Sequence, residues 1–304
     1  MDKNLTALSA VEEKCYTIEA LTPVTMHGAT GKNAEFRLSS LKGMMRYWFR
    51  LLSSHESEKM MHEKEDELFG HVLNKASKSS VWLTLNEPAD TRTAQFRPSS
   101  SGDFFIDAIK EGSEWEACLS AKNSQKHHLK TAEAVFEAAV LLGGFGQRGR
   151  HGASAFHLVD HPLTDARDYL NKLASLMDEL DVEAIIDEET HRIFRQSGLG
   201  TRADRPYWLE TKVIISGLQE NADQILRGMR SATHENAGRY RGVLGNFNPR
   251  FPAPLHTSVV KLEDGYAVTV SEMNHRNNRG YQEAKTFYET ELYEKLKHLR
   301  KDVR

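Results

Sequence analysis

Hydrophobic and polar positions alternate from Cys15 to Thr22, and this period of two predicts a β-strand. The glycine-containing segment 23–32 then predicts a loop. A 3.6-residue period follows and predicts a helix, which Ser39 or Ser40 would cap. The expected buried face of the strand consists of Tyr16, Ile18 and Ala20, and that of the helix of Leu41, Met44, Met45, Trp48, Leu51 and Leu52.

The same two periods recur in the rest of the first half. They predict strands over 81–85, 104–106 and 153–159, and a helix that Thr131 caps and the glycines from Gly143 end. The inward face of this helix would hold Ala132, Val135, Phe136, Ala139 and Val140. The resulting order is close to that of the split βαβ, ferredoxin-like unit.

The second half repeats this outline after a connecting helix over 164–180. The expected elements are a strand over 207–215, a helix over 222–229, a hairpin of 256–262 and 266–270 around the Glu-Asp-Gly turn, and a final helix from about Tyr281. We therefore expect an α+β chain with two related domains, 1–162 and 163–304.

Composition and cysteine use narrow the class of protein. Hydrophobic residues make up 39% and charged residues 27% of the 304 residues, which is typical of a globular chain. No apolar run approaches about 18 residues, so no membrane span is expected, and Met1 to Glu12 lacks the apolar core of a signal peptide. Cys15 and Cys118 form no CxxC, which favours a reduced cytoplasmic protein with neither a disulfide nor a zinc framework.

Positive charge is concentrated in three segments of a chain whose total is −3. Residues 36–50 carry +4, residues 143–152 carry +2 and residues 227–250 carry +4, so the remainder is acidic. The total argues mildly against a free-standing nucleic-acid binder. The distribution favours a polyanion held in one groove, with the acidic surface left to protein partners or solvent.

Lys42, Arg46 and Arg50 are spaced by four residues and would form one ridge of the first helix. Successive side chains would lie about 6 Å apart, an interval suited to the phosphates of a nucleic-acid strand. A solvated helix face with long side chains over apolar neighbours is the alternative. No acid on this helix neutralises the row.

The segment GGFGQRGRHG, residues 143–152, lies between the second predicted helix and a strand. Its glycines would let backbone N–H groups approach an anion, and Arg148 and Arg150 would add charge-assisted hydrogen bonds to phosphate. A flexible, solvated connection is the alternative. The segment is neither a P-loop nor a dinucleotide fingerprint, because no Gly-Lys-Ser/Thr follows and because the helix precedes it.

Histidines and acids do not suggest a metal centre. His27 could act as a general base in an RNA-cleaving enzyme, or it could be structural, since no acid–base partner is visible. His62-Glu63 lacks the second histidine of HExxH, and His127-His128 is an isolated pair. Neither a metal nor a cofactor is expected.

Four of these segments carry a resemblance to a known family. Residues 35–50, with Lys42-Gly43 followed by an arginine, three aromatics and a second arginine, resemble the first-helix motif of the CRISPR RAMP family. They are most similar to the version in the end-capping subunit of the type III-B (Cmr) effector. Leu68-Phe69-Gly70, the glycine loop and residues 248–255 resemble further family elements in the same order.

The match covers roughly residues 14 to 271, with departures at Ala153, where the loop often has a further glycine, and at Ala253, where serine is usual. The resemblance implies tandem ferredoxin-like (RRM-type) domains with helical insertions. It implies a place near the 3′ part of the CRISPR RNA, where target single-stranded RNA is captured in antiviral defence. The backbone RAMP subunit and the second end-capping subunit would be its neighbours, and cleavage would belong to other subunits.

We therefore expect an RNA-binding groove and no catalytic residue. The cations expected to line it are Arg37, Lys42, Arg46, Arg50, Arg148 and Arg150. The glycines expected to let amides approach phosphates are Gly144, Gly146 and Gly149. A second-domain contact is expected from Arg239, Arg241 and Arg250.

Two other functions fit the same residues. One is a metal-independent RAMP endoribonuclease that processes CRISPR precursor RNA, with His27 as base and Arg148 as transition-state stabiliser. The other is a structural adaptor whose basic segments bind acidic protein surfaces.

Overall fold

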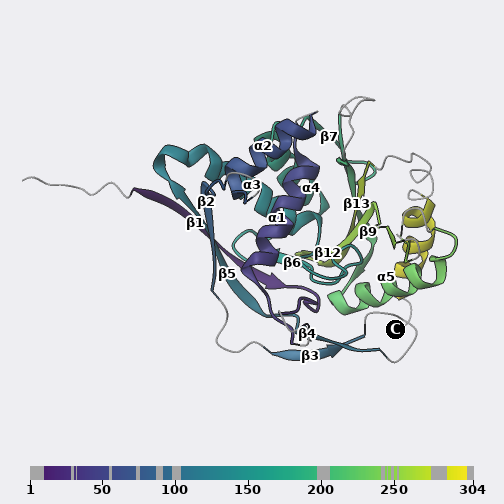
Figure 1. Ribbon diagram of the computed structural model, residues 1–304. Helices are drawn as coiled ribbons and strands as arrows, with labels where there is room; N and C mark the ends of the chain where they lie inside the picture. Colours follow the sequence, from purple (N-terminus) through teal and green to yellow (C-terminus); the bar gives the residue numbers. More distant parts are fainter. Residues whose placement is uncertain are drawn as a thin grey trace, which may run out of the picture.

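The chain builds two antiparallel sheets with helices between and outside them (Figure 1). The computed structural model describes residues 10–28, 31, 33–54, 57–72, 76–86, 92–97, 104–196, 206–240, 244, 246–247, 250–251, 253–274 and 286–299.

The first sheet has the strand order β2-β5-β1-β6, and all of its pairs are antiparallel. Its strands are β1 (Val11–Ala20), β2 (Val81–Asn86), β5 (Glu114–Lys122) and β6 (Phe156–Leu158). Helix α1 (Leu38–Leu52) connects β1 to β2, and α3 (Lys126–Leu142) connects β5 to β6. Because this order and these connections are those of the split βαβ unit, the predicted ferredoxin-like fold is confirmed.

Two insertions extend this unit. Helix α2 (Glu58–Phe69) packs on α1 before the chain enters β2. A hairpin of β3 (Thr93–Phe96) and β4 (Ile106–Ile109) interrupts the connection from β2 to β5. The strand expected at 104–106 begins at Ile106 and continues to Ile109.

The second sheet has the order β12-β13-β9-β8-β7. Its strands are β7 (Ala184–Asp187), β8 (Arg192–Arg195), β9 (Trp208–Gln219), β12 (Leu255–Leu262) and β13 (Gly265–Met273). Strand β9, helix α5 (Ala222–Asn236), β12 and β13 repeat the path of β1, α1, β2 and β5. In the first sheet β6 pairs with the outer side of β1. In the second sheet β8, which precedes β9 in the chain, takes the corresponding place beside β9. A short ladder joins β10 (Asn246–Phe247) to β11 (Arg250–Phe251).

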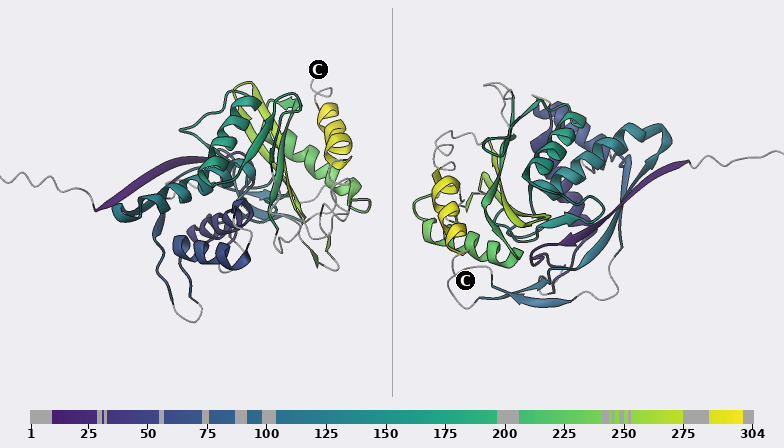
Figure 2. Two further views of the ribbon diagram at one scale, coloured as in Figure 1. Left: turned by 90° about the horizontal axis from the view of Figure 1, so that it is seen from above. Right: turned by 180° about the vertical axis from the view of Figure 1, so that it is seen from behind.

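The layers alternate from one side of the molecule to the other (Figures 1 and 2). Helices α1, α3 and α4 (Ala166–Glu179) lie between the two sheets, whereas α5 and α8 (Tyr293–Leu299) cover the outer side of the second sheet. A π-helical segment, Phe287–Leu292, leads into α8, and a short 3-10 turn, Asn123–Gln125, precedes α3. One hydrophobic core extends from the first sheet through these helices to the second. The boundary predicted after residue 162 falls between β6 and α4 and stays a prediction.

Burial follows the predicted periods. Tyr16, Ile18 and Ala20 of β1 are buried, and so is the stripe of α1 apart from the partly buried Met44. The second half of α3, residues 134–142, is buried on all sides because sheets and helices flank it.

Two helix starts differ from prediction. Helix α1 begins at Leu38, with Arg37 at the N-cap and no side-chain cap, so neither Ser39 nor Ser40 caps it. Helix α3 begins at Lys126, and Thr131 bonds within it to the carbonyl of His127. The last helical segment is described from Thr286 onward, and its predicted start at about Tyr281 lies outside the described residues.

The expectation of two reduced cysteines is wrong for this structure. Cys15 and Cys118 are direct partners in the β1–β5 ladder, with Cα atoms 4.0 Å apart, and form a disulfide with an S–S distance of 2.03 Å. They are distant in sequence, so only strand register brings them together. None of the helices in the described segments has the length and the apolar run that crossing a bilayer requires.

Candidate nucleic-acid interface

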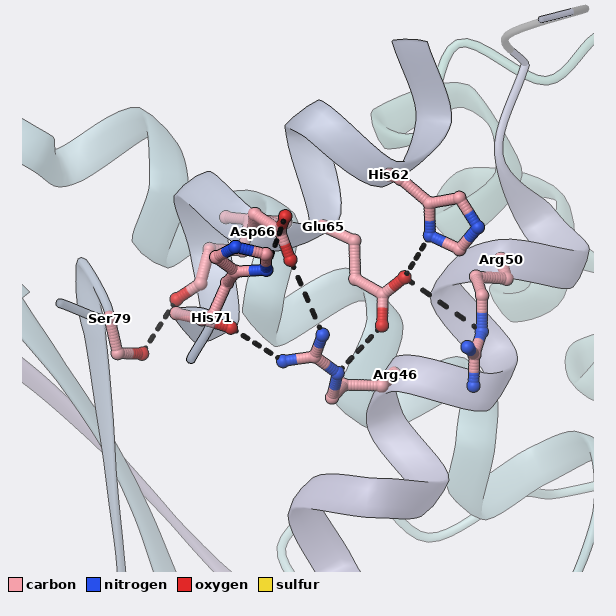
Figure 3. A network of polar contacts seen from close by, with 9 residues as sticks. Arg46, Arg50, His62, Glu65, Asp66, His71 and Ser79 are labelled. Atoms are coloured by element: carbon pink, nitrogen blue, oxygen red, sulfur yellow. Dashed lines mark hydrogen bonds and ion pairs between the residues drawn. The ribbon is translucent and has the colours of Figure 1, made fainter. Parts of the chain in front are cut away.

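Arg46, the middle cation of the α1 ridge, is held by α2 and the chain that follows it (Figure 3). Its Nε lies 2.6 Å from an oxygen of Glu65, its Nη1 donates to the carbonyl of Gly70 at 2.7 Å, and its Nη2 lies 3.5 Å from Asp66. Glu65 is fully buried. All three guanidinium nitrogens therefore have partners within the fold.

No acid lies on α1 itself, but the fold brings Glu65 of α2 to the ridge, where it neutralises part of the row. Glu65 also lies 3.9 Å from Nε of Arg50, at a longer and more exposed contact. Arg50 keeps 42% of its side chain exposed, compared with 28% for Arg46. The ridge consequently offers Arg50 to the solvent more than Arg46.

Lys42 lies one turn before Arg46 and is partly buried. Burial lowers the pKa of its ammonium group, and the charge of Arg46 lowers it further. The electrostatic field of Arg46 thus still reaches its neighbour on the ridge, although Arg46 is ion-paired with Glu65. Arg37 lies one turn earlier, at the N-cap, where its backbone N–H points to the sulfur of Met26 at 3.4 Å.

The glycine loop is anchored to the segment that follows β1. Gln147 N–H donates to the carbonyl of Thr25 at 3.0 Å, and Phe145 N–H donates to the carbonyl of Ser154 at 2.9 Å. The hydroxyl of Thr25 also donates to the carbonyl of Gln147. These bonds give the loop a defined path, which argues against a flexible connection.

Two of the three predicted glycines make close contacts inside the protein. A Cβ on Gly144 would lie 2.4 Å from the carbonyl oxygen of Ala153, and one on Gly149 would lie 2.7 Å from that of Gly144. Gly146 has a φ of +143°, which favours glycine. The fold itself therefore requires these glycines, and the approach of their amides to phosphates stays a prediction.

The glycine loop and α1 meet at Tyr47. The guanidinium of Arg150 lies over the Tyr47 ring, 5.3 Å from its centroid, and its Nη1 donates to the carbonyl of Ala253 at 2.9 Å. The Tyr47 hydroxyl hydrogen-bonds Nε2 of the buried His256 at 2.8 Å. Three segments distant in sequence thus converge at Tyr47. Burial raises the pKa of the Tyr47 hydroxyl, and the charges of Arg150 and Arg50 oppose this rise, so one arginine of the loop and one of the ridge lie near the same hydroxyl.

The charges of the loop arginines act on two histidines beside them. Burial lowers the pKa of His151 to about 4, and the charges of Arg148 and Arg150 lower it further. Burial also lowers the pKa of His256 well below its usual value, with the charge of Arg150 contributing. Both imidazoles are therefore neutral at pH 7, and the positive charge of this region comes from the arginines. Arg148 is exposed and adopts a φ of 60°, a region that few non-glycine residues occupy.

His27 lies on the same loop as Thr25, in an isolated bridge with Ala34. The hydrogen bond between Thr25 and Gln147 therefore brings the loop of His27 alongside the glycine loop. Among the described residues, the one group of histidines, cysteines and acids with metal-ligand spacing is Glu13, Cys15 and Cys118, and both cysteines are in the disulfide.

Of the predicted second-domain cations, Arg239 has its partners away from this interface. Arg239 lies 3.1 Å from Glu291 and stacks on Tyr240, in the layer of α5 on the outer side of the second sheet. Arg241 lies outside the described residues, as does the side chain of Arg250. Tyr47 and His256 were not among the predicted site residues. Tyr47 is one of three consecutive aromatic residues, whose pattern does not show which of them meets the loop, and a single histidine gives no local signal.

Comparisons with known proteins agree with this architecture. Residues 17–157 match the family model described as RAMP superfamily. The CRISPR system Cmr subunit Cmr1-2 of Pyrococcus furiosus is 26% identical in an alignment of 178 residues, which covers 47% of this chain and 93% of that relative.

Two solved structures share the fold. The apo crystal structure of Cmr1 from Pyrococcus furiosus matches with a TM-score of 0.61 at 16% identity, over 88% of this chain and 89% of that one. A chain of the type III-B Cmr-beta complex bound to cognate target RNA matches with a TM-score of 0.58 at 11% identity, over 95% and 99%.

Proposed function

Residues 17–157 of this chain belong to the RAMP superfamily, and from this premise we propose that the chain is an RNA-binding subunit of a type III-B (Cmr) CRISPR effector. Its sequence relationship to a Cmr subunit and its fold support this assignment. Within that complex it would cap the assembly near the 3′ part of the CRISPR RNA and help capture target RNA in antiviral defence, in the cytoplasm. Its neighbours would be the backbone RAMP subunit and the second end-capping subunit.

The observation that carries the proposal is the meeting of α1 and the glycine loop at Tyr47. Arg150 stacks on a residue of α1 that lies three positions before Arg50, so the cations of both segments border one surface. A single-stranded RNA needs such a row of cations to follow its backbone, because each phosphate carries a charge.

The cations divide into two roles on this surface. Lys42, Arg50 and Arg148 would contact phosphates directly, because each is partly or largely exposed. Arg46 and Arg150 would hold the surface in shape, since Arg46 fixes α2 to α1 and Arg150 fixes the glycine loop to Tyr47 and Ala253.

The salt dependence of RNA affinity tests the proposal. Short single-stranded RNA is titrated with the full chain and with the Arg50→Ala and Arg148→Ala variants at several salt concentrations. Each variant should weaken binding, and each lost phosphate contact should lower the logarithmic salt slope by about 0.7.

Arg167→Ala is the matched control for these variants. Arg167 is exposed on α4 and ion-paired with Glu188 at 2.9 Å, so its loss removes equal charge away from the interface. Unchanged RNA affinity and salt slope in folded Arg50 and Arg148 variants would refute the interface. If the Arg167 variant lost as much affinity as these two, the loss would come from net charge and not from a specific contact.

We further propose that the chain does not cleave RNA. The rival endoribonuclease has one geometric point in its favour, the loop contact that brings His27 beside the glycine loop. Incubation of the protein with labelled repeat RNA in the absence of metal distinguishes an endoribonuclease from a subunit that only binds RNA. Cleavage that His27→Ala abolishes would favour the enzyme, whereas intact RNA at saturating protein favours the binding subunit.

A further inference from the structure

A cleft of about 550 Å³ lies between the β3–β4 hairpin and α5, on a part of the surface that the preceding assignment does not use. Figure 2 shows the hairpin running alongside α5. Phe96 and Phe105 of the hairpin region, Arg227 and Arg230 of α5, and Pro23 of the loop after β1 all line it. The volume is in the range of small-molecule sites.

Positive charge is in excess in this cleft. Four cations, Arg97, Lys110, Arg227 and Arg230, line it, together with two acids, Glu111 and Asp223. Burial lowers the pKa of Arg230, and the charge of Asp223 opposes this effect. The charges of Arg227 and Arg97 lower the same pKa further, because the three guanidinium groups repel one another. An anion would relieve this repulsion.

Aromatic rings accompany these cations. The guanidinium of Arg230 lies 5.3 Å from the centroid of Phe96 and donates to the carbonyl of Arg97, so one wall is a fixed guanidinium–ring stack. Phe105 is 49% exposed at the edge of the cleft, although folding alone would favour its burial. Flat apolar rings beside guanidinium groups match the two parts of a nucleotide, a base that stacks and a phosphate that pairs.

We propose that this cleft binds one unpaired nucleotide of an RNA strand, with the base against Phe105 and the phosphate on Arg227 and Lys110. The inference rests on the proposed RNA-binding function and extends it to a second subsite. Arg227 suits this role because it keeps 70% of its side chain exposed while ion-paired with Asp223 at 2.6 Å.

The cleft and the glycine loop are connected through one short segment. Pro23 lines the cleft, and its carbonyl accepts a hydrogen bond from Ser154 N–H at 3.1 Å. Two residues later, the carbonyl of Thr25 accepts one from Gln147 N–H at 3.0 Å. The same short segment therefore borders the cleft and anchors the glycine loop.

Two variants of the cleft and two matched controls test the inference. Phe105→Ala and Arg227→Ala remove exposed groups, so folding should be preserved. The controls are Phe104→Ala, the exposed neighbour that does not line the cleft, and Arg167→Ala, an equally exposed, ion-paired arginine on α4. The probe is a short fluorescein-labelled single-stranded RNA, and the double variant Phe105→Ala/Arg227→Ala should bind it roughly tenfold more weakly, since base stacking and a phosphate contact are both lost.

A 4-thiouridine in the same RNA provides a second measurement. Irradiation should link it to the tryptic peptide that ends at Lys110, and Phe105→Ala should reduce this product while Phe104→Ala does not. Adenosine monophosphate at micromolar concentration should not displace the RNA, because a subsite of a strand holds one nucleotide weakly.

The outcomes separate the two proposals. RNA binding that depends on Arg50 and Arg148 but not on Phe105 or Arg227 overturns the cleft assignment and leaves the proposed function intact. Absence of RNA binding by the unmodified chain overturns both. Displacement by micromolar adenosine monophosphate identifies a site for free nucleotides and overturns the subsite.

Discussion

Arg46 shows that a cation at an interface can belong to the fold more than to the ligand. It has the same four-residue spacing as Lys42 and Arg50, yet its three guanidinium nitrogens contact Glu65, Asp66 and the Gly70 carbonyl. Its partners come from a helix that follows α1, so spacing along α1 alone cannot reveal them.

Replacing Arg46 by alanine should lower the free energy of unfolding by about 3 kcal/mol, because the buried Glu65 would lose its shortest ion pair. Arg50→Ala should cost less than about 1 kcal/mol, since its contact with Glu65 is longer and more exposed. Denaturant unfolding of both variants measures the difference. The double variant Arg46→Met/Glu65→Met should recover most of the loss, and a double variant as unstable as Arg46→Ala would contradict the ion-pair explanation.

Glu272 should make stability depend on pH. It lies opposite Glu210 in the β13–β9 ladder, and Glu210 in turn pairs with Arg192 at 3.1 Å. Burial, and then the charge of Glu210, raises the pKa of Glu272 from 4.5 to about 8. The folded chain therefore keeps a proton that the unfolded chain loses, and this carboxyl's contribution to stability should fall between pH 4.5 and 8 by at most about 1.4 kcal/mol per pH unit.

Glu272→Gln should remove that slope and stabilise the chain at pH 8 relative to the unmodified protein. Thermal unfolding at several pH values measures it, and Glu263→Gln, at an exposed position in the β12–β13 turn, is the control. A slope that survives in the Glu272 variant would assign the effect to another group.

Among the helices, strands and turns, the hydrophobic periodicity predicted those that depend on local sequence pattern. The alternation in β1, the stripe of α1 and the Glu-Asp-Gly turn each have a local signal, and the corresponding elements are present. Helix starts were predicted less well, because α1 begins without the serine cap that the sequence offered. The disulfide was missed because pairing of Cys15 with Cys118 depends on the register between two strands that are distant in sequence.

The glycine loop should be sensitive to a single methyl group. Gly144→Ala would place a Cβ 2.4 Å from the carbonyl of Ala153, and backbone atoms cannot move aside as a flexible side chain can. We expect a loss of about 2 kcal/mol or more in the free energy of unfolding. Gly43→Ala on α1 is the contrasting control: nothing lies within 4 Å of its added Cβ, so it should stabilise the helix by about 0.5–1 kcal/mol. Equal effects at both positions would contradict the packing argument.

At the scale of the whole molecule, the candidate site depends on how the layers stack. Three basic segments are distinct along the sequence. The structure brings two of them together at Tyr47, whereas Arg239 of the third pairs with Glu291. Tyr47, Arg150 and His256 come from three segments, so only the packing of α1 against β12 and the glycine loop reveals their contact. The predicted RNA groove requires α1 and the glycine loop to lie close together, and they meet at Tyr47.

Amide hydrogen exchange with and without single-stranded RNA tests that convergence most directly. The account predicts that RNA slows exchange in peptides covering residues 23–28, 37–50 and 143–152, and leaves peptides of α4 and of the region around Arg239 unchanged. Slowing confined to the outer face of the second sheet, or absent at RNA concentrations that saturate binding, would contradict it.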